Sequence, residues 1–499
     1  MTAAFLLLSL FGPLEGGESS GDSSAALQAF VAPVEQSRFA ALTSYDSLQA
    51  LLMRIGREPL IHVSTLATTR EGRKVSVVRV SGGPAAITGK PKVKVLLFAQ
   101  QHGDEPSGKE ALTLLLAKAA SRTMDAIVEK VDLLIVPQMN PDGAERRQRR
   151  SADTLDLNRS HVLLNSPEVK GLHDLFLAEM PEVTLDIHEF GSYSTSWIKS
   201  GFIKTADVQL GMLTNLNSPA RIRQYQRDRV FGFIADAMRE KNYRFGEYIV
   251  GSPEDRIRHS TTEINDGRQS FGILGTLSFI QEGRNGKELE DRLERRARSQ
   301  LAAVEALLEF CARYTAEICS LVSGERADLL HLSRVPVALR MEHVPGNGVL
   351  TIPVQEVISN RDTIWSVNPY HGVIRSLVSI ALPSKYLVPR EDSAIVALLH
   401  AHHVQTEKVL ARRHIKAETF RLDSIGFDVL EEDSLPRPAG RWLTESLVAR
   451  SGDILVPTRQ LHSLFLATVL EPESMWGIAK YPRFRTLVPG TTFPIRRLP

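Results

Sequence analysis

The 499-residue sequence predicts an α/β protein with a mixed, mostly parallel sheet flanked by helices, followed by a smaller β-rich C-terminal domain. Three observations support this fold class. Short apolar runs, each long enough for one buried strand, alternate with longer segments of helical periodicity. Several of these runs end on a histidine or a carboxylate. After Ser323, β-branched residues and turn signals become frequent, which indicates a change of architecture.

The domain boundaries follow from the same changes in residue pattern along the chain. We expect a possible signal segment and linker at residues 1–25, the main α/β domain at 30–323 and the β-rich domain at 325–499. Residues 3–12 have the length of the apolar core of an export signal and are too short to span a bilayer, although the basic residues that usually precede such a core are missing. We therefore expect an exported protein, periplasmic or extracellular. The alternative is a frayed apolar terminus on a cytoplasmic protein.

The elements are predicted in order along the chain. A helix is expected at 35–55, an edge hairpin at 61–68 and 74–80, and a buried strand at 93–99. A helix should begin at Ser107, which has capping-box spacing to Glu110. Further strands are expected at 131–139, 183–188 and 275–282, and further helices at 167–179, 218–241 and 286–321.

Composition limits the classes of partner. The chain has 60 basic and 58 acidic residues and a net charge of +2, which gives no reason to expect a nucleic acid or a membrane surface as partner. Its two cysteines, Cys311 and Cys319, fall in one predicted helix. Eight residues of helix rise by ~12 Å, too far for a disulfide, so we expect free thiols.

Chemically active side chains follow three predicted strands. His102 and Glu105 lie on the loop after the strand at 93–99, and His188 and Glu282 end two others. The carboxyl ends of such strands share one edge of a sheet, so these side chains should meet. Two histidines and one glutamate are the protein ligands of an open hydrolytic zinc site. Glu282 is then free to act as general base on water.

Plainer interpretations exist for each of these residues. His102 and Glu105 could form an incidental ion pair on a polar turn, and His188 could be a buried histidine satisfied by a carbonyl. Glu282 could pair with Arg284. Glu189 competes with His188 only if the strand register slips by one residue. We treat four other polar residues as structural: Glu168, Asp186, His161 and His173.

Five ordered stretches resemble the zinc carboxypeptidase family. They are His102 to Glu105, Asn140 to Gly143, Asp156 to Arg159, and the strands that end at His188 and at Glu282. The likeness covers roughly residues 30–320. The C-terminal part, with its stretches 452–457 and 470–474, is similar to an extension found in one bacterial subgroup.

The resemblance implies a role for each matching position. His102, Glu105 and His188 would hold one zinc ion, and Glu282 would be the general base. Asn158 and Arg159 would bind the substrate's terminal carboxylate, and Arg149 would stabilise the oxyanion. The register of the arginine-rich loop leaves Arg147 and Arg150 as alternatives to Arg149. No tyrosine lies between residues 255 and 275, so the tyrosine of the family's mobile loop has no counterpart here, and Tyr243 and Tyr248 come too early in the chain to be assigned.

The expected activity is zinc-dependent hydrolysis of a C-terminal peptide or amide bond in a peptide with a free C-terminus. One alternative is an amidohydrolase of the succinylglutamate desuccinylase and aspartoacylase kind, which acts on N-acyl amino acids. The turn at 140–143 favours the peptidase. A second alternative is a non-catalytic binding protein on the same fold. The presence of every ligand and of the base argues against it.

Overall fold

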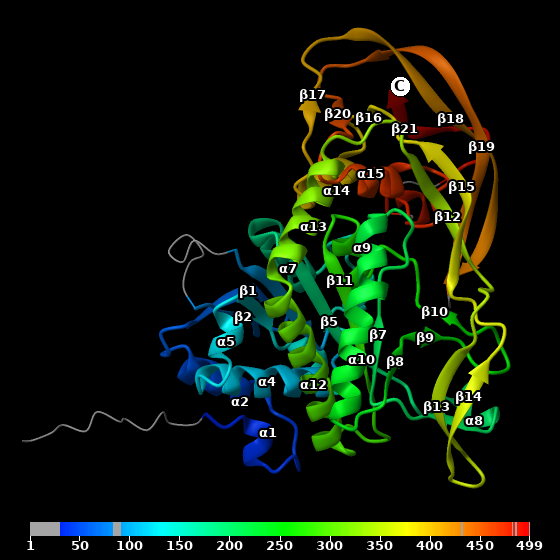
Figure 1. Ribbon diagram of the computed structural model, residues 1–499. Coiled ribbons are helices and arrows are strands. Elements are labelled where there is room, and N and C mark those ends of the chain that lie inside the picture. Colours follow the sequence, from blue (N-terminus) through cyan, green and yellow to red (C-terminus); the bar gives the residue numbers. More distant parts are fainter. Residues whose placement is uncertain (1–29, 83–90, 431–432, 482, 485–486, 499) are drawn as a thin grey trace, which may run out of the picture.

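The computed structural model describes residues 30–82, 91–430, 433–481, 483–484 and 487–498 (Figure 1). The predicted export segment and linker lie outside these ranges. Within them, no helix combines the length and the apolar character that crossing a membrane requires.

An eight-stranded sheet forms the centre of the molecule, in the order β1-β2-β4-β3-β5-β11-β7-β8 (Figure 1). Its strands are β1 (Ile61–Thr68), β2 (Lys74–Val80), β3 (Val93–Ala99), β4 (Val131–Val136), β5 (Val183–Phe190), β7 (Val208–Gly211), β8 (Phe245–Glu247) and β11 (Leu277–Arg284). The inner pairs β4-β3, β3-β5 and β5-β11 are parallel, and β1-β2 is the predicted edge hairpin. The predicted mixed, mostly parallel sheet is confirmed.

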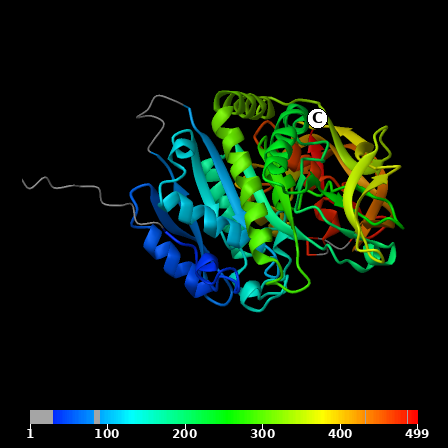
Figure 2. The same cartoon turned by 60° about the horizontal axis from the view of Figure 1, so that its bottom comes forward.

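The two faces of this sheet bury different residues because side chains alternate along a strand. Val95 and Leu97 of β3 pack in one core with α4 (Ser107–Ala120) and α12 (Leu293–Arg313). In Figure 2 the cyan α4 and the yellow-green α12 lie side by side across the sheet. Leu96 and Phe98 point the other way, toward α7 (Pro167–Glu179). Burial on both faces explains why the inner strands are rich in apolar residues.

Two predicted helices are interrupted. The helix expected at 35–55 is two helices, α1 (Pro33–Gln36) and α2 (Tyr45–Ile55), because Arg38 and Phe39 have φ values of 53° and 60°, outside the helical region. The helix expected at 286–321 begins only at Leu293 and breaks at Tyr314 before α13 (Thr315–Leu329). Cys311 and Cys319 therefore lie on different helices, and both are free thiols as expected.

The capping box predicted for α4 is wrong. The helix begins at Ser107, but its N-cap is Pro106 and no side chain caps it. The Glu110 carboxylate accepts instead from the backbone N–H of Thr43, at 2.9 Å. A long-range partner has replaced the local one, which sequence spacing cannot reveal.

The elements between the main strands are mostly short. They are α5 (Asp125–Val128), α6 (Pro141–Glu145), η1 (Leu157–Arg159), α8 (Thr195–Lys199), β6 (Phe202–Lys204), β9 (Ile249–Val250), β10 (Arg258–His259) and α11 (Gly267–Gly272). The helix predicted at 218–241 is α9 (Ala220–Tyr225), a π-helical turn η2 (Gln226–Val230) and α10 (Phe231–Glu240) in succession.

The C-terminal region is rich in β structure, as predicted. Its elements are β12 (Pro336–Val344), β13 (Leu350–Glu356), β14 (Asp362–Val367), β15 (Val373–Ala381), β16 (Lys385–Val388), α14 (Ser393–Ala401), β17 (Glu407–Lys408), β18 (Arg413–Leu430), β19 (Asp433–Ala449), β20 (Ile454–Pro457), α15 (Ser463–Leu470), η3 (Ile478–Lys480) and β21 (Thr492–Leu498). Tyr386 and Phe465 share a hydrophobic core with Phe98 and Phe176. Strand β6 pairs with β13, so the segment between β5 and β7 also joins this region.

Candidate active site

The sheet brings the predicted site residues to one edge. His102 and Glu105 lie between β3 and α4, at the carboxyl end of β3. His188 lies near the end of β5, which is parallel to β3. Glu282 is the register partner of His188 on the neighbouring parallel strand β11. The predicted strand ends therefore meet because parallel strands end on the same side.

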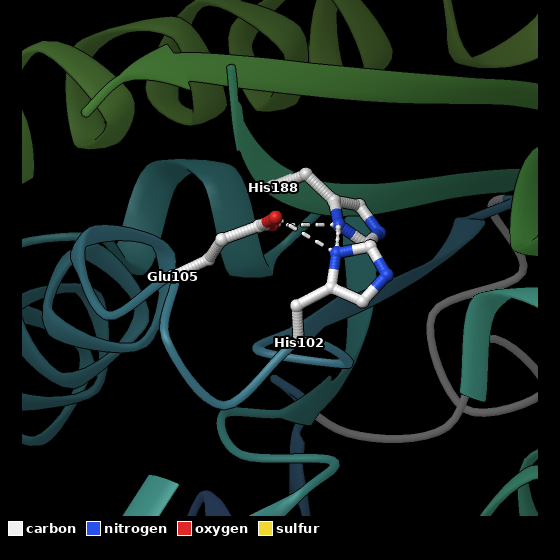
Figure 3. A group of neighbouring side chains, drawn as sticks. All are labelled: His102, Glu105 and His188. Atoms are coloured by element: carbon white, nitrogen blue, oxygen red, sulfur yellow. Dashed lines mark hydrogen bonds and ion pairs between the residues drawn. The ribbon is translucent and has the colours of Figure 1, made fainter. Parts of the chain in front are cut away.

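His102, Glu105 and His188 form one compact group (Figure 3). Glu105 Oε1 lies 2.8 Å from His102 Nδ1, and Glu105 Oε2 lies 2.9 Å from His188 Nδ1. The two Nδ1 atoms are 3.1 Å apart. One ligand atom from each residue lies within 4.8 Å of the others, so all three can reach one metal ion.

Carboxylates hold the far side of each ring. His102 Nε2 lies 3.1 Å from Asp156 Oδ1, and His188 Nε2 lies 2.8 Å from Asp186 Oδ1. A carboxylate that accepts from Nε2–H, as Asp156 does from His102, leaves the lone pair on Nδ1 free for a metal. Two imidazole nitrogens and one carboxylate oxygen are the donor set of catalytic zinc sites. The residues present therefore fit zinc.

The charges of this group reinforce one another. Burial would lower the pKa of both rings, but the carboxylates of Glu105, Asp156 and Asp186 outweigh it and raise the pKa values of His102 and His188. Burial would raise the pKa of Glu105, but the two rings hold that pKa far below its usual value. Glu105 is therefore ionised and available as a ligand over a wide pH range.

Arg149 is the arginine of the loop that reaches the ligand group. Its Nη1 lies 3.1 Å from His102 Nδ1, and its Nε and Nη2 donate to Asp156 Oδ2 at 3.1 and 2.9 Å. Arg147 pairs with Glu290 instead, and Arg150 donates to a loop carbonyl. Of the three candidates, the structure brings only Arg149 to the site.

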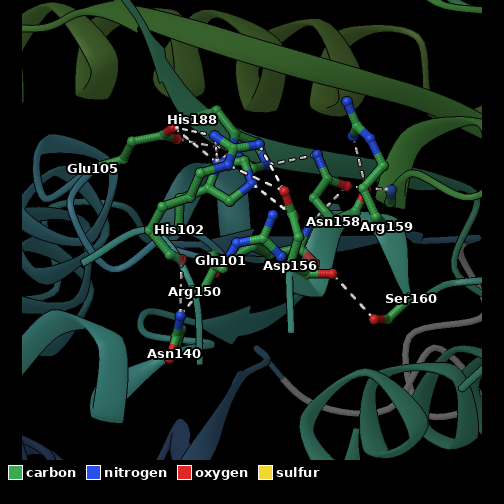
Figure 4. A network of polar contacts seen from close by, with 12 residues as sticks. Gln101, His102, Glu105, Asn140, Arg150, Asp156, Asn158, Arg159, Ser160 and His188 are labelled. Atoms are coloured by element: carbon green, nitrogen blue, oxygen red, sulfur yellow. Dashed lines mark hydrogen bonds and ion pairs between the residues drawn. The ribbon is translucent and has the colours of Figure 1, made fainter. Parts of the chain in front are cut away.

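Asn158 and Arg159 lie on the turn η1 beside the ligands (Figure 4). Asn158 Oδ1 accepts from the backbone N–H of Gly267 at 2.8 Å, and its Nδ2 lies 3.3 Å from His188 Nε2. The Arg159 side chain is 37% exposed, and its Nη1 donates to the carbonyl of Asn158. Its Nε also lies 3.7 Å from Glu263 Oε2, so a negatively charged group from solution would compete with this ion pair for the guanidinium.

Glu282 is buried at the same edge, 5% exposed. Burial, together with the charge of Glu105, raises the pKa of Glu282 to about 7, so this carboxyl group can exchange a proton near neutral pH. The Tyr248 hydroxyl forms a hydrogen bond with it. Tyr248 lies between β8 and β9, upstream of residues 255–275, where the resemblance to the family places a tyrosine. Spacing along the chain gave no signal for this contact.

Glu189 is not part of the ligand group. Its carboxylate pairs with Arg296 Nη2 at 2.7 Å and accepts from the backbone N–H of Ser107 at 3.1 Å. Both of its oxygens are therefore engaged on the other side of β5. The strand register is the one predicted, with His188 facing Glu105.

A chain of buried polar groups continues behind His188, and the sequence analysis missed it. Gln101 Nε2 donates to Asp186 Oδ2 at 2.8 Å, and Gln101 Oε1 lies 3.0 Å from His161 Nε2. His161 Nδ1 in turn lies 3.0 Å from His173 Nε2. Asp186 and His161 thus support the site, although their sequence positions gave no sign of it.

Comparisons with known proteins agree with this geometry. Residues 49–190 match the zinc carboxypeptidase family model. Carboxypeptidase 2 of Trichophyton equinum is 25% identical over 476 residues, covering 91% of this chain and 86% of that protein. Carboxypeptidase 2 of Trichophyton rubrum is 25% identical over 453 residues, covering 86% and 81%. The crystal structure of a metallo-carboxypeptidase from Burkholderia cenocepacia has a TM-score of 0.44 at 20% identity, covering 54% of this chain and 69% of that one.

These findings place the chain in a class of metallopeptidases, hydrolases whose metal ligands lie at strand ends. Residues 49–190 match a zinc carboxypeptidase domain, and most of the chain is similar in sequence to fungal carboxypeptidases. A match over 91% of the chain extends beyond residue 323. The similarity to these fungal relatives therefore includes part of the C-terminal region.

Proposed function

We propose that the protein is a zinc carboxypeptidase that hydrolyses the C-terminal peptide bond of a peptide with a free carboxyl terminus. The observation that carries this proposal is the meeting of His102, Glu105 and His188 within 4.8 Å, with Glu282 as the register partner of His188. The match of residues 49–190 to the zinc carboxypeptidase family model supports it.

His102, Glu105 and His188 would hold one zinc ion per chain. When bound, zinc acts as a Lewis acid that polarises the scissile carbonyl and makes water a better nucleophile at neutral pH. The carboxylates of Asp156 and Asp186 fix the two rings with Nδ1 turned toward Glu105. The ligand group is thereby oriented before the metal arrives.

The other residues take the remaining roles. Glu282 would accept a proton from the attacking water and pass it to the leaving amine, and Tyr248 would orient its carboxyl group. Arg149 would donate to the developing oxyanion. Asn158 and Arg159 would bind the terminal carboxylate, for which a guanidinium fork is well suited.

The alternatives are weaker. The family match favours a peptidase over an amidohydrolase of N-acyl amino acids. Among the described residues, no ligand or base is missing, as it would be in a binding protein that had lost catalysis. We also propose export, supported by the apolar segment 3–12. The mass of the mature protein would show whether this segment is removed.

The direct test replaces the base and keeps the ligands. In Glu282→Gln the amide cannot accept the proton, so we expect peptide hydrolysis to fall by about 10²–10⁴-fold while the zinc content stays at the parental level. Release of the terminal amino acid is measured on paired peptides with a free or an amidated C-terminus, together with N-acyl amino acids. Glu288→Gln, at an exposed carboxylate, is the matched control and should keep parental activity.

Three results would contradict the proposal. The base is wrongly assigned if Glu282→Gln hydrolyses the peptides at the parental rate. The peptidase assignment fails if the protein cleaves N-acyl amino acids but no peptide. Hydrolysis of free and amidated peptides at equal rates would remove the role given to Asn158 and Arg159.

A further inference from the structure

Lys204 is a buried lysine that the proposed mechanism does not use. It ends strand β6, in the segment between β5 and β7, and is 7% exposed. Its Nζ lies 4.7 Å from the centroid of the Phe190 ring and 5.5 Å from that of Trp197. Burial lowers the pKa of Lys204 to about 8, so the side chain still carries its charge in most molecules at neutral pH.

The surroundings of this ammonium group leave its hydrogen-bonding capacity unused. Among the described residues, no oxygen accepts a hydrogen bond or forms an ion pair with Lys204, and its close contacts are two aromatic rings. Cation-π contacts compensate only part of the loss of hydration of a buried ammonium. A buried charge of this kind normally has an anionic or hydrogen-bonding partner.

Lys204 lies on the catalytic side of the sheet. Phe190, which its ammonium covers, is two residues after His188 on β5, and side chains two residues apart on a strand point to the same face. Burial lowers the pKa of Lys204, and the negative charge of Glu282 partly offsets this effect. The lysine therefore borders the space next to the proposed base.

A second polar group in this space also lacks a partner. Gln209 on β7 is the register partner of Glu282, so the two side chains lie next to each other on one face. Within the described part of the chain, Gln209 Oε1 is buried and accepts no hydrogen bond. A peptide N–H bound beside Glu282 would supply the missing donor.

The two ends of the site differ in their charged neighbours. Arg159, proposed to bind the terminal carboxylate, lies on the turn η1 and pairs with Glu263. Lys204 lies against Phe190 at the end of β5. With the terminal carboxylate at Arg159 and the scissile bond beside Glu282, the chain upstream of that bond leads toward Lys204.

We propose that Lys204 binds the side-chain carboxylate of an acidic residue upstream of the scissile bond, so that the enzyme prefers peptides with glutamate or aspartate there. This inference rests on the proposed carboxypeptidase function. A carboxylate would give the Lys204 ammonium the charge-assisted hydrogen bond that the protein does not provide. The aromatic rings of Phe190 and Trp197 would hold the ammonium in place.

The test compares three proteins on matched peptides. The zinc-loaded full chain, Lys204→Met and Lys199→Met are assayed on peptides that carry Glu or Gln at each of the two positions before the scissile bond, and separately at the C-terminal position. Methionine keeps the length of the lysine side chain without its charge. Lys199 is exposed on α8 in the same segment and serves as the matched control. Lys204→Gln is a second variant, and melting temperature and zinc content are recorded for all.

The parental protein and Lys199→Met should favour Glu over Gln at an upstream position by at least about tenfold in kcat/KM. Lys204→Met and Lys204→Gln should lose this preference through a higher KM for the Glu peptides, with kcat on the Gln peptides unchanged. A parental protein without an upstream acidic preference, or with one only at the C-terminal residue, overturns the inference.

An equal fall in kcat on every peptide in both Lys204 variants also overturns the inference. Lys204 would then influence the base Glu282 and would not bind an acidic side chain of the substrate. If the parental protein hydrolyses none of the peptides, the proposed function itself fails and the inference falls with it. Hydrolysis without acidic preference leaves the proposed function standing and removes only the inference.

Discussion

Two groups of buried histidines in this molecule have opposite electrostatics. In the first group, His102 and His188, each Nε2 faces a carboxylate, and the pKa of each ring is raised. The second group packs between α7 and the C-terminal region and consists of His161, His173, His402 and His462. Burial lowers the pKa of all four, to about 4 for His161 and His402 and about 3 for His462.

The difference lies in the partners, because both groups are buried. His402 Nε2 donates to the carbonyl of Val162 at 2.7 Å, and His161 contacts an amide and another imidazole. None of these partners carries a full negative charge that could stabilise an imidazolium. A carboxylate partner, rather than burial, therefore distinguishes the two candidate ligands from the second group.

The largest predicted effect is acid destabilisation through the second group. Its histidines have a lower pKa in the folded protein than the usual 6.5 of the unfolded chain, so the unfolded state binds more protons below pH 6.5. The contribution of these neutral histidines to the free energy of unfolding is complete above pH 6.5 and is lost as the pH falls toward about 4. Each histidine should cost roughly 1.4 kcal/mol of unfolding free energy for each pH unit in this window. Urea unfolding at a series of pH values measures it.

His402→Gln gives the matched comparison for this effect. Glutamine can still donate to the carbonyl of Val162 but does not titrate. The variant should therefore lose less stability than the parent between pH 6.5 and 4. Parallel stability curves for the two proteins would mean that His402 is not held neutral by burial.

The second prediction concerns the carboxylate behind a ligand. In Asp186→Asn the amide no longer stabilises the Nε2–H of His188, so zinc affinity should fall by about 10–100-fold. Competition with a chelator measures the affinity. Asp174→Asn is the control, because that carboxylate is exposed and pairs with Lys170. An unchanged affinity in Asp186→Asn would show that the carboxylate does not tune the ligand.

The smallest effect is expected for an exposed histidine that does have a carboxylate partner. His403 pairs with Asp174 at 2.9 Å, but the two side chains are 58% and 41% exposed. Solvent screening limits such pairs to roughly 1 kcal/mol or less. His403→Ala should change the unfolding free energy by no more than this and leave zinc content unaltered. A larger loss would show that a partner matters even without burial.

The sequence was sufficient to predict where the inner strands end and which polar residues lie at those ends. The runs before Gln101, His188 and Glu282 are buried on both faces and therefore rich in apolar residues, so the strands and their polar ends could be predicted together. Arg149 could be chosen from the loop only by analogy with the family. The contact with His102 depends on how the loop folds back onto the ligands.

The parts that could not be predicted depend on contacts between distant segments. Tyr248 follows β8, which is separated from β11 by a single strand, β7, and it can therefore reach Glu282. No local sequence pattern encodes this arrangement of the strands. Lys204 is unremarkable in sequence and becomes unusual only when Phe190 and Trp197 cover it. Glu110 fits a capping pattern but is engaged by Thr43, 67 residues away.

Strand β6 ends in Lys204 and pairs with β13 of the C-terminal region, whose Tyr386 and Phe465 also cover Phe98 and Phe176. A chain truncated near residue 330 would therefore lose the strand partner of β6 and part of the hydrophobic core around Phe98 and Phe176. It would have a bare hydrophobic surface and an open strand edge at β6, a combination that promotes aggregation. Gene fission or domain shuffling at that point would be selected against, so we expect the two halves to be inherited as one evolutionary unit.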